Sequence, residues 1–341
     1  MSVATAGRTA IAGIVASLLL ASGATAAETS IKFSLDFKFE GPSAVFLLPL
    51  DKGYFKAEGL DVAIDPAAGS VEPITRVASG TYDMGFADVN SLIRFRDANP
   101  GTPVKAVFMV YNKPPFAVIG RKSRGIYNPK DLEGKKLGAP LADGAYAQWP
   151  IFVQANGIDA SKVTIENVGF PVREPMLAAG QVDAITGFSF SSFINLKDRG
   201  VPVEDIVVLL MADYGVDLYG NAIIVNPKFA AEHPDAVKGF LKALTKGIKE
   251  TVKSPDTAVD SVIRRNDAAR KSVELDRLNI AIRDNMVTTE VRRRGYGGID
   301  SARFAKAIDQ IGLTYKWQAE KPKQENIFDA SYLPPDAERK F

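Results

Sequence analysis

The chain carries VASGTYDM at residues 77–84 and LAAGQVDA at residues 177–184, and the two stretches share one pattern. In each, a helical run ends at a glycine, and an aspartate follows shortly before an apolar strand. Glycine readily adopts the left-handed conformation that ends many helices, so both stretches predict the same helix–turn–strand joint. Chance similarity of two such joints is the alternative, but the repeat favours a molecule of two α/β lobes built alike. We interpret the two aspartates, Asp83 and Asp183, as turn or cap residues.

Short strands alternate with helical stretches along the rest of the chain, which argues for an α/β fold. The predicted strands are 31–37, 60–64 and 135–139. The predicted helices are 44–51, 70–79, 143–155 and 227–252, the last with a restart at Pro234. Two further β-prone runs, 116–120 and 221–225, flank the middle block, and we interpret them as the crossings between the lobes. Ligands of open α/β sheets bind beyond the carboxyl ends of the strands, so two facing lobes predict a ligand cleft.

The N-terminal residues have the pattern of a cleaved signal peptide, predicted here as residues 1–26. Arg8 is the only charged side chain before Glu28, the apolar run 11–20 follows it, and Ala-Thr-Ala stands at 24–26. The apolar run is too short to span a bilayer, which needs about 20 residues. We therefore expect an exported protein that resides in the periplasm.

The composition excludes several kinds of chemistry. The chain has no cysteine and one histidine, so thiol nucleophiles, thiolate metal sites and two-histidine zinc sites are impossible. Basic residues number 42 and acidic residues 40, which gives no sign of a nucleic-acid partner. We expect no metal and no cofactor. Catalysis by carboxylates alone survives this filter, because aspartate and glutamate are plentiful.

Four blocks resemble one family of solute-binding proteins. They are DKGYF at 51–55 with EGLDV at 58–62, RVASG at 76–80, DLEGKKLG at 131–138, and the stretch 226–237 that opens the returning helix. On these blocks the chain resembles the NMT1/THI5-like group, which includes receptors for sulfonates, taurine, nitrate and pyrimidine precursors of thiamine. The blocks are specific for the family, and none is specific for a ligand.

The resemblance implies a two-lobed periplasmic-binding-protein fold of the second type, with the ligand cleft between the lobes. Lobe one would take residues 28–117 and 222–341, and lobe two 118–221. The expected protein is a monomer that hands its solute to the membrane permease of an ABC transporter. The family also contains a fungal pyrimidine synthase that relies on an active-site histidine and a cysteine-rich motif. This chain departs from that pattern, so we expect a binding protein rather than an enzyme.

Five loops should line the cleft and supply its ligand-binding side chains. The candidates are Asp36, Phe37, Glu40, Ser70, Asp88, Asn90, Tyr146, Trp149, Arg173, Glu174 and Phe188. The family often has tryptophan where Phe37 stands, and phenylalanine keeps the flat face without the indole N–H. Two alternatives stay open, because Trp149 would also suit an ordinary core and Arg173 and Glu174 could simply pair with each other.

The loop chemistry favours a nitrogen-bearing ligand. Acidic acceptors outnumber cationic donors in the candidate loops, which suits a ligand with N–H groups or positive charge. With several aromatic residues beside them, we expect a small polar solute with a planar, pyrimidine-like portion. The alternatives are a receptor for a sulfonate-, taurine- or nitrate-type anion, a secreted carboxylate-based enzyme, and a periplasmic sensor subunit of the same fold.

Overall fold

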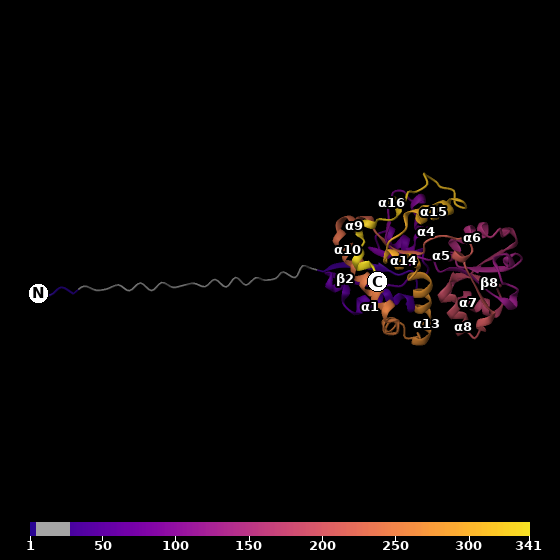
Figure 1. The fold of residues 1–341 in the computed structure, drawn as a ribbon, viewed down its shortest axis with the longest axis horizontal. Coiled ribbons are helices and arrows are strands. Elements are labelled where there is room, and N and C mark those ends of the chain that lie inside the picture. Colours follow the sequence, from indigo (N-terminus) through magenta and orange to yellow (C-terminus); the bar gives the residue numbers. More distant parts are fainter. Residues whose placement is uncertain (5–27) are drawn as a thin grey trace.

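The structure is a computed structural model that describes residues 1–4 and 28–341 (Figure 1). The predicted signal peptide falls largely on residues 5–27, so that prediction lies outside the described residues. Within the described part of the chain, no helix combines the length and the apolar character that crossing a membrane requires.

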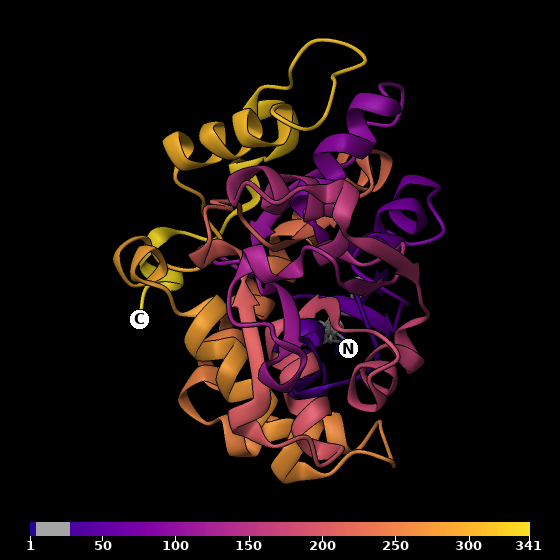
Figure 2. The same ribbon diagram turned by 90° about the vertical axis from the view of Figure 1, so that its right-hand side faces the viewer.

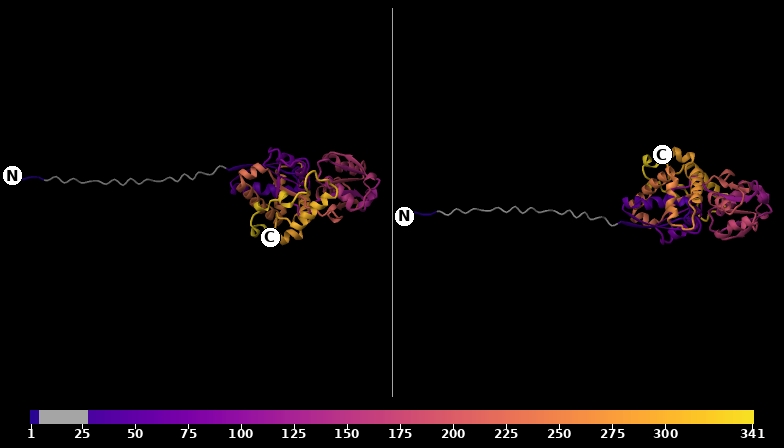
Figure 3. Two further views of the ribbon diagram at one scale, coloured as in Figure 1. Left: turned by 90° about the horizontal axis from the view of Figure 1, so that it is seen from above. Right: turned by 90° about the horizontal axis from the view of Figure 1, so that it is seen from below.

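Two five-stranded sheets form the framework, and we call the parts built on them lobe one and lobe two. Sheet one runs, edge to edge, β2 (Leu60–Asp65), β1 (Thr29–Ser34), β3 (Met84–Asp88), β10 (Asn221–Val225) and β4 (Lys105–Met109). Sheet two runs β7 (Thr164–Asn167), β6 (Lys136–Ala139), β8 (Ala184–Phe188), β5 (Phe116–Arg121) and β9 (Ile206–Leu210). Figure 3 shows the lobes side by side, with lobe two in magenta on the right of both views.

The two sheets share one arrangement of parallel and antiparallel neighbours, in agreement with two lobes built alike. In sheet one, β1 pairs in parallel with β2 and β3, and β10 pairs antiparallel with β3 and β4. In sheet two, β6 pairs in parallel with β7 and β8, and β5 pairs antiparallel with β8 and β9.

The repeated joint itself is confirmed. Asp83 accepts a hydrogen bond from the backbone N–H of Lys32 at 2.7 Å, and Asp183 accepts one from Lys136 at 2.9 Å. Each aspartate therefore ties the start of one central strand to its parallel neighbour, which is the structural role expected of them.

The crossings between the lobes lie next to the predicted runs rather than within them. Residues 116–120 are strand β5 of sheet two, and 221–225 are strand β10 of sheet one, so the chain crosses at 110–115 and 211–220. Both runs are apolar because each strand has a strand on either side and is buried along almost its whole length. A buried central strand and an apolar crossing segment have the same sequence pattern, so the sequence alone does not distinguish them. The predicted lobe ranges consequently differ by one or two residues from the membership of the sheets.

The α-helices of lobe one pack around sheet one, and most of them belong to the C-terminal part of the chain. They are α1 (Ala44–Asp51), α2 (Tyr54–Ala57), α3 (Glu72–Ala78), α4 (Val89–Ala98), α9 (Pro227–Glu232), α10 (Pro234–Lys253), α11 (Pro255–Ala258), α12 (Asp260–Ile263), α13 (Lys271–Ala281), α14 (Thr289–Arg294), α15 (Ser301–Gly312), α16 (Gln324–Ile327) and α17 (Asp336–Arg339). The long predicted helix divides at His233, because Pro234 has no N–H to continue the ladder of α9.

Lobe two has four α-helices among the described residues. They are α5 (Gly144–Ala147), α6 (Trp149–Ala155), α7 (Phe170–Ala179) and α8 (Ser189–Asp198). The predicted helix 143–155 divides at Gln148, next to Pro150 in the first turn of α6. Helix α8 packs against α13 of lobe one, while the C-terminal segment with α15 lies at the opposite end of the molecule (Figure 2).

Buried apolar side chains continue from one lobe into the other. One cluster joins Ile93 and Ala222 of lobe one to Val118 and Leu137 of lobe two, and all four are 0% exposed. The lobes are therefore packed against each other beside the crossings. This packing fixes which loops of lobe one face lobe two.

Candidate ligand-binding cleft

A cleft between the lobes collects the loops that follow the strands. Lobe one lines it with Asp36, Phe37, Lys38, Glu40, Pro42, Ser43, Phe46, Gly69, Ser70, Phe86 and Tyr111, and lobe two with Asp143, Phe170, Arg173, Phe188, Phe190 and Ser191. Most of these residues follow the carboxyl ends of strands, as the rule for open α/β sheets predicts. The cavity measures about 40 Å³, well below the roughly 300–1,000 Å³ of ligand pockets. A ligand larger than a few water molecules therefore requires the lobes to part.

Aromatic rings from both lobes meet across the cleft. Phe37 of lobe one and Phe170 of lobe two lie edge to face with ring centroids 5.4 Å apart. Tyr111 lies 6.3 Å from Phe188 and 5.9 Å from Phe190 in the same kind of geometry. These rings offer flat apolar surfaces to a ligand and contact each other when the lobes are together.

The lobe-two side of the cleft is built around a buried guanidinium. Arg173 is 3% exposed, lies 2.8 Å from Glu174 Oε1 and 3.6 Å from Asp143 Oδ2, and stands over the ring of Phe170. Burial by itself would raise the pKa of Glu174, but the Arg173 guanidinium and hydrogen bonds lower it by more, so the pKa lies below its ordinary value. The two residues thus pair with each other. Arg173 lines the cleft, and Glu174 lies behind it, where it also accepts a hydrogen bond from Ser192.

The lobe-one side holds Glu40, which reaches across to lobe two. Its Oε2 accepts a hydrogen bond from Ser191 Oγ at 2.6 Å and lies 3.5 Å from Nε of Arg277 on α13. Its Oε1 lies 3.3 Å from Lys38 Nζ. Arg277 also donates to Asn195 of α8 at 2.7 Å. Glu40 and Arg277 therefore join the lobes along one edge of the cleft.

Asp36 lies at the turn after β1, where the predicted strand ends three residues early. Its Oδ2 accepts a hydrogen bond from Asn221 Nδ2 at 2.9 Å. Burial, and then the nearby Glu40 carboxylate, raise the pKa of Asp36 to about 7. Burial, with Asp36 and Glu40 next in importance, also raises the pKa of Tyr111 well above its ordinary value. These three groups share one acidic corner of the cleft.

Six of the predicted site residues line this cleft, and five do not. Those that line it are Asp36, Phe37, Glu40, Ser70, Arg173 and Phe188; those that do not are Asp88, Asn90, Tyr146, Trp149 and Glu174. Trp149 is 6% exposed and packs against Phe152 in the core, which is the alternative left open from the sequence. Tyr146 packs against the same core cluster.

Asp88 and Asn90 serve the start of helix α4. Asp88 is 0% exposed and caps the helix by accepting from the backbone N–H groups of Asn90 and Ser91, each at 3.0 Å. Asn90 donates to the carbonyl of Tyr219 at 2.7 Å. None of residues 87–90 lines the cleft, because β3 passes directly into α4 there and these two side chains serve the helix start.

Sequence reasoning missed several lining residues. Tyr111, Phe170 and Ser191 belong to this group, and so do Phe46 and Phe86. Tyr111 follows β4 and Phe170 follows β7, so the rule that located the other loops would have located these two. Among the described residues, no cluster of three or more His, Cys, Asp or Glu side chains is arranged to hold a metal ion.

A family model described as NMT1/THI5 like matches residues 43–258, which is more than half of the chain. The chain belongs to the NMT1/THI5-like family. This confirms the family that the sequence blocks resemble.

Relatives of this family member include named binding proteins. The chain is 27% identical over 314 residues to the formylaminopyrimidine-binding protein of Halalkalibacterium halodurans, covering 88% of this chain and 90% of that protein. It is 28% identical over 220 residues to the riboflavin-binding protein RibY of Chloroflexus aurantiacus, covering 64% of this chain and 61% of that protein. The chain thus spans about three fifths of the length of RibY.

Enzymes also occur among the relatives. The chain is 26% identical over 212 residues to a 4-amino-5-hydroxymethyl-2-methylpyrimidine phosphate synthase of Schizosaccharomyces pombe, covering 60% of each protein. Membership of the NMT1/THI5-like family therefore does not by itself separate binding from catalysis.

Solved structures confirm the predicted two-lobed periplasmic-binding-protein fold. The ligand-binding component of an ABC-type import system from Staphylococcus aureus aligns with a TM-score of 0.67 at 12% identity, covering 89% of this chain and 97% of that one. The alkanesulfonate-binding protein SsuA of Xanthomonas axonopodis pv. citri aligns with a TM-score of 0.64 at 13% identity, covering 85% and 96%. At these identities the likeness concerns the fold alone.

Proposed function

We propose that this NMT1/THI5-like protein is a periplasmic substrate-binding receptor. It captures a small polar organic solute between its two lobes and delivers it to the membrane permease of an ABC importer. The observation that carries this proposal is the interlobe cleft, where loops after strands of both sheets bring aromatic rings and buried polar groups together. The cleft lies beside the two crossings, so a hinge motion there opens it to ligand.

The chemistry of the cleft favours an organic solute over a simple oxyanion. The two cationic side chains that line it already face carboxylates, since Lys38 pairs with Glu40 and Arg173 pairs with Glu174. An anion would have to displace these partners. The relatives named for formylaminopyrimidine and riboflavin also point to planar nitrogen heterocycles as the ligand class.

The protein acts without catalysis in this proposal, although some relatives are named as synthases. The chain has no cysteine, and its single histidine, His233, is exposed at the start of α10 and lies outside the cleft lining. The receptor acts in the periplasm as a monomer, after export directed by residues 1–26.

A thermal-shift screen with small metabolites tests the receptor function directly. The panel holds formylaminopyrimidine, riboflavin, taurine, an alkanesulfonate and nitrate. We expect one heterocycle to raise the melting temperature, because a ligand that binds only the native state stabilises it. The bound solute should be recovered chemically unchanged by mass spectrometry, and X-ray scattering should report lobe closure. Product formation would contradict the receptor function, and selective binding of nitrate or a sulfonate would contradict the ligand class.

A further inference from the structure

Asp36 differs from every other charged side chain that lines the cleft. Lys38 lies 3.3 Å from Glu40, and Arg173 lies 2.8 Å from Glu174 and 3.6 Å from Asp143. Within residues 28–341, no lysine or arginine forms an ion pair with Asp36, whose side-chain partner is the neutral amide of Asn221. The cleft therefore contains one carboxylate whose charge is not balanced by a neighbouring cation.

One further polar atom of the same cleft, Ser70 Oγ, has no hydrogen-bond partner among the described residues, and Ser70 is 3% exposed. Glu40 is 5% exposed, and its Oε1 makes no hydrogen bond but lies 3.3 Å from the Lys38 ammonium. Burying such atoms without a partner costs free energy, which a ligand recovers if it supplies the missing hydrogen bonds. A carboxylate oxygen accepts and cannot donate, so an N–H or O–H group of the ligand can donate to Glu40 Oε1 beside Lys38.

The overall charge of the lining has the same sign. Asp36, Glu40 and Asp143 line the cleft with three carboxyl groups, against the two cations Lys38 and Arg173. When all are ionised the balance is 2 − 3 = −1. A ligand bearing one positive charge neutralises it.

We propose, on the basis of the receptor function above, that Asp36 anchors the solute by pairing with a positively charged N–H group such as a protonated amine or an amidinium. The rings of Phe37 and Tyr111, which line the same corner, pack against the carbon atoms next to that group. Ser70 and Glu40 accept the remaining N–H donors. Asp36 thus determines specificity for nitrogenous cations over neutral compounds of the same shape.

Binding of a cation at Asp36 makes affinity depend on pH. Without ligand, burial and the Glu40 carboxylate hold the pKa of Asp36 at about 7, opposed by backbone N–H groups and Asn221. The other charged or titratable groups facing this corner are Lys38 on the same loop, Tyr111 after β4, and Asp143 and Arg173 from lobe two. An adjacent cation lowers a carboxyl pKa by about 1–3 units, so below pH 7 binding must displace a proton. Affinity should therefore be about tenfold weaker at pH 6 than at pH 8.

Calorimetric titration with benzamidine and benzamide tests the anchor, because the two probes share a shape and differ in charge. We expect the wild-type protein to bind benzamidine about 10- to 100-fold more tightly than benzamide at pH 8, as a charged hydrogen bond implies. The preference should shrink about tenfold at pH 6. Asp36→Asn, which keeps the side-chain shape, should lose both the preference and the pH dependence. The control Asp61→Asn removes one exposed carboxylate from strand β2 and should behave as wild type.

Three outcomes would overturn the anchor. The first is that the wild-type protein binds benzamidine and benzamide with equal affinity at both pH 6 and pH 8. This outcome requires no variant. Another is tight binding of a neutral or anionic panel solute that Asp36→Asn leaves unchanged; the receptor function then stands without the anchor. A wild-type protein that binds neither probe nor any panel solute would contradict the receptor function itself, and the anchor with it.

Discussion

Asp88 is a buried carboxylate whose hydrogen-bonding capacity the protein uses itself. Besides the two backbone N–H groups that it caps, it accepts hydrogen bonds from Asn90 Nδ2 at 2.8 Å and Ser91 Oγ at 2.6 Å. A fifth donor is Gln148 Nε2 of lobe two, at 2.9 Å, and Gln148 in turn accepts from Arg94 Nη2 of lobe one at 3.0 Å. Asp88 therefore stabilises helix α4 and the contact between the lobes at once.

Replacing Asp88 should cost stability rather than ligand recognition. Asp88→Ala removes a helix cap, worth about 0.5–2 kcal/mol, and leaves buried donors without an acceptor, at about 1–3 kcal/mol. We expect urea denaturation to show a free energy of unfolding lower by about 2–4 kcal/mol. The exposed control Asp61→Ala should change it by less than about 0.5 kcal/mol. Normal stability combined with weaker ligand binding would instead make Asp88 a ligand contact.

Asp36 should also affect the stability of the ligand-free protein. The pKa of Asp36 is about 7 in the folded protein, whereas its ordinary value is 3.8. Between pH 3.8 and pH 7 the folded state therefore holds a proton that the unfolded state has lost. Its contribution to stability is complete below about pH 4 and is lost as pH rises through 7. Asp36→Asn should consequently melt higher than wild type at pH 8 and at a similar temperature at about pH 4. A variant that melts lower than wild type at pH 8 would contradict this sign.

At the scale of elements, the repeated joint depends on two glycines in the left-handed region. Gly80 has φ of 75° and Gly180 has φ of 72°, each between the end of a helix and the aspartate that ties the next strand. Residues with a Cβ pay about 1–2 kcal/mol in this conformation. The same backbone geometry thus sets the direction of β3 and of β8.

Gly80→Ala isolates this backbone cost. The added Cβ would have free space, because its nearest neighbour is Asn226 Nδ2 at 3.8 Å. We expect the free energy of unfolding to fall by about 1–2 kcal/mol. Gly101→Ala is the matched control, since Gly101 has no positive φ and no atom within 4 Å of the added Cβ, and it should be neutral or slightly stabilising. Equal effects at the two sites would mean that φ at Gly80 is not the cause.

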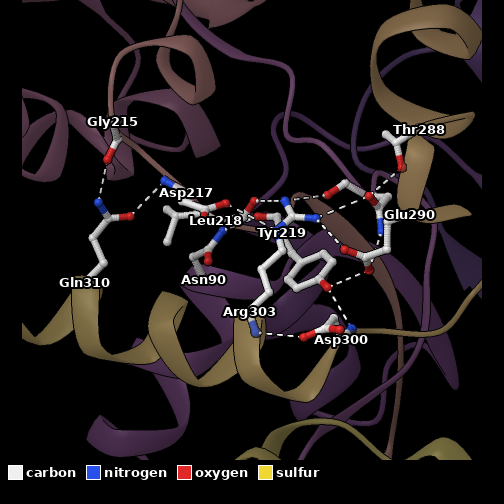
Figure 4. A network of polar contacts seen from close by, with 11 residues as sticks. Asn90, Gly215, Asp217, Leu218, Tyr219, Thr288, Glu290, Asp300, Arg303 and Gln310 are labelled. Carbon is white, nitrogen blue, oxygen red and sulfur yellow. Dashed lines mark hydrogen bonds and ion pairs between the residues drawn. The ribbon is translucent and has the colours of Figure 1, made fainter.

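At the scale of the whole molecule, Arg303 of α15 holds the two crossings together (Figure 4). Its Nη2 donates to the carbonyl of Asn112 in one crossing at 2.9 Å and to the carbonyl of Leu218 in the other at 2.7 Å. Its guanidinium stacks 4.0 Å from the ring of Tyr219, whose hydroxyl donates to Glu290 of α14 at 2.7 Å. The C-terminal segment therefore braces the part of the chain about which the lobes must turn.

Arg303→Ala should loosen this hinge. Loss of charged hydrogen bonds, at about 1.5–3 kcal/mol each, should lower stability and broaden the distribution of lobe separations. Because the chain has no cysteine, dyes can be placed on Asp61→Cys in lobe one and Lys122→Cys in lobe two for single-molecule energy transfer. Arg293→Ala, at an exposed position of α14, is the control. An unchanged distance distribution in Arg303→Ala would show that the brace does not limit the motion.

Much of this architecture is predictable from local sequence, because helix ends and strand ends carry their own signals. Helix 44–51 and the restart at Pro234 have the predicted bounds, and the carboxyl ends of strands lead to the correct loops. The direction of a side chain within a loop is decided by packing that sequence patterns do not contain. Asp88 precedes a helix and is a cap, whereas Asp36 follows a strand and faces the cleft, yet both are acidic loop residues in sequence.

The position of β10 has a consequence for the order in which the molecule can form during synthesis. This strand lies between β3 and β4 and is the last strand of the chain, so sheet one lacks an inner member until residue 225 has left the ribosome. Sheet two is made entirely from 116–210, a continuous stretch that emerges earlier. Nascent chains generally fold unit by unit as they appear. Here the middle of the polypeptide can complete its sheet first, while the N-terminal strands must wait for a segment translated more than a hundred residues after them.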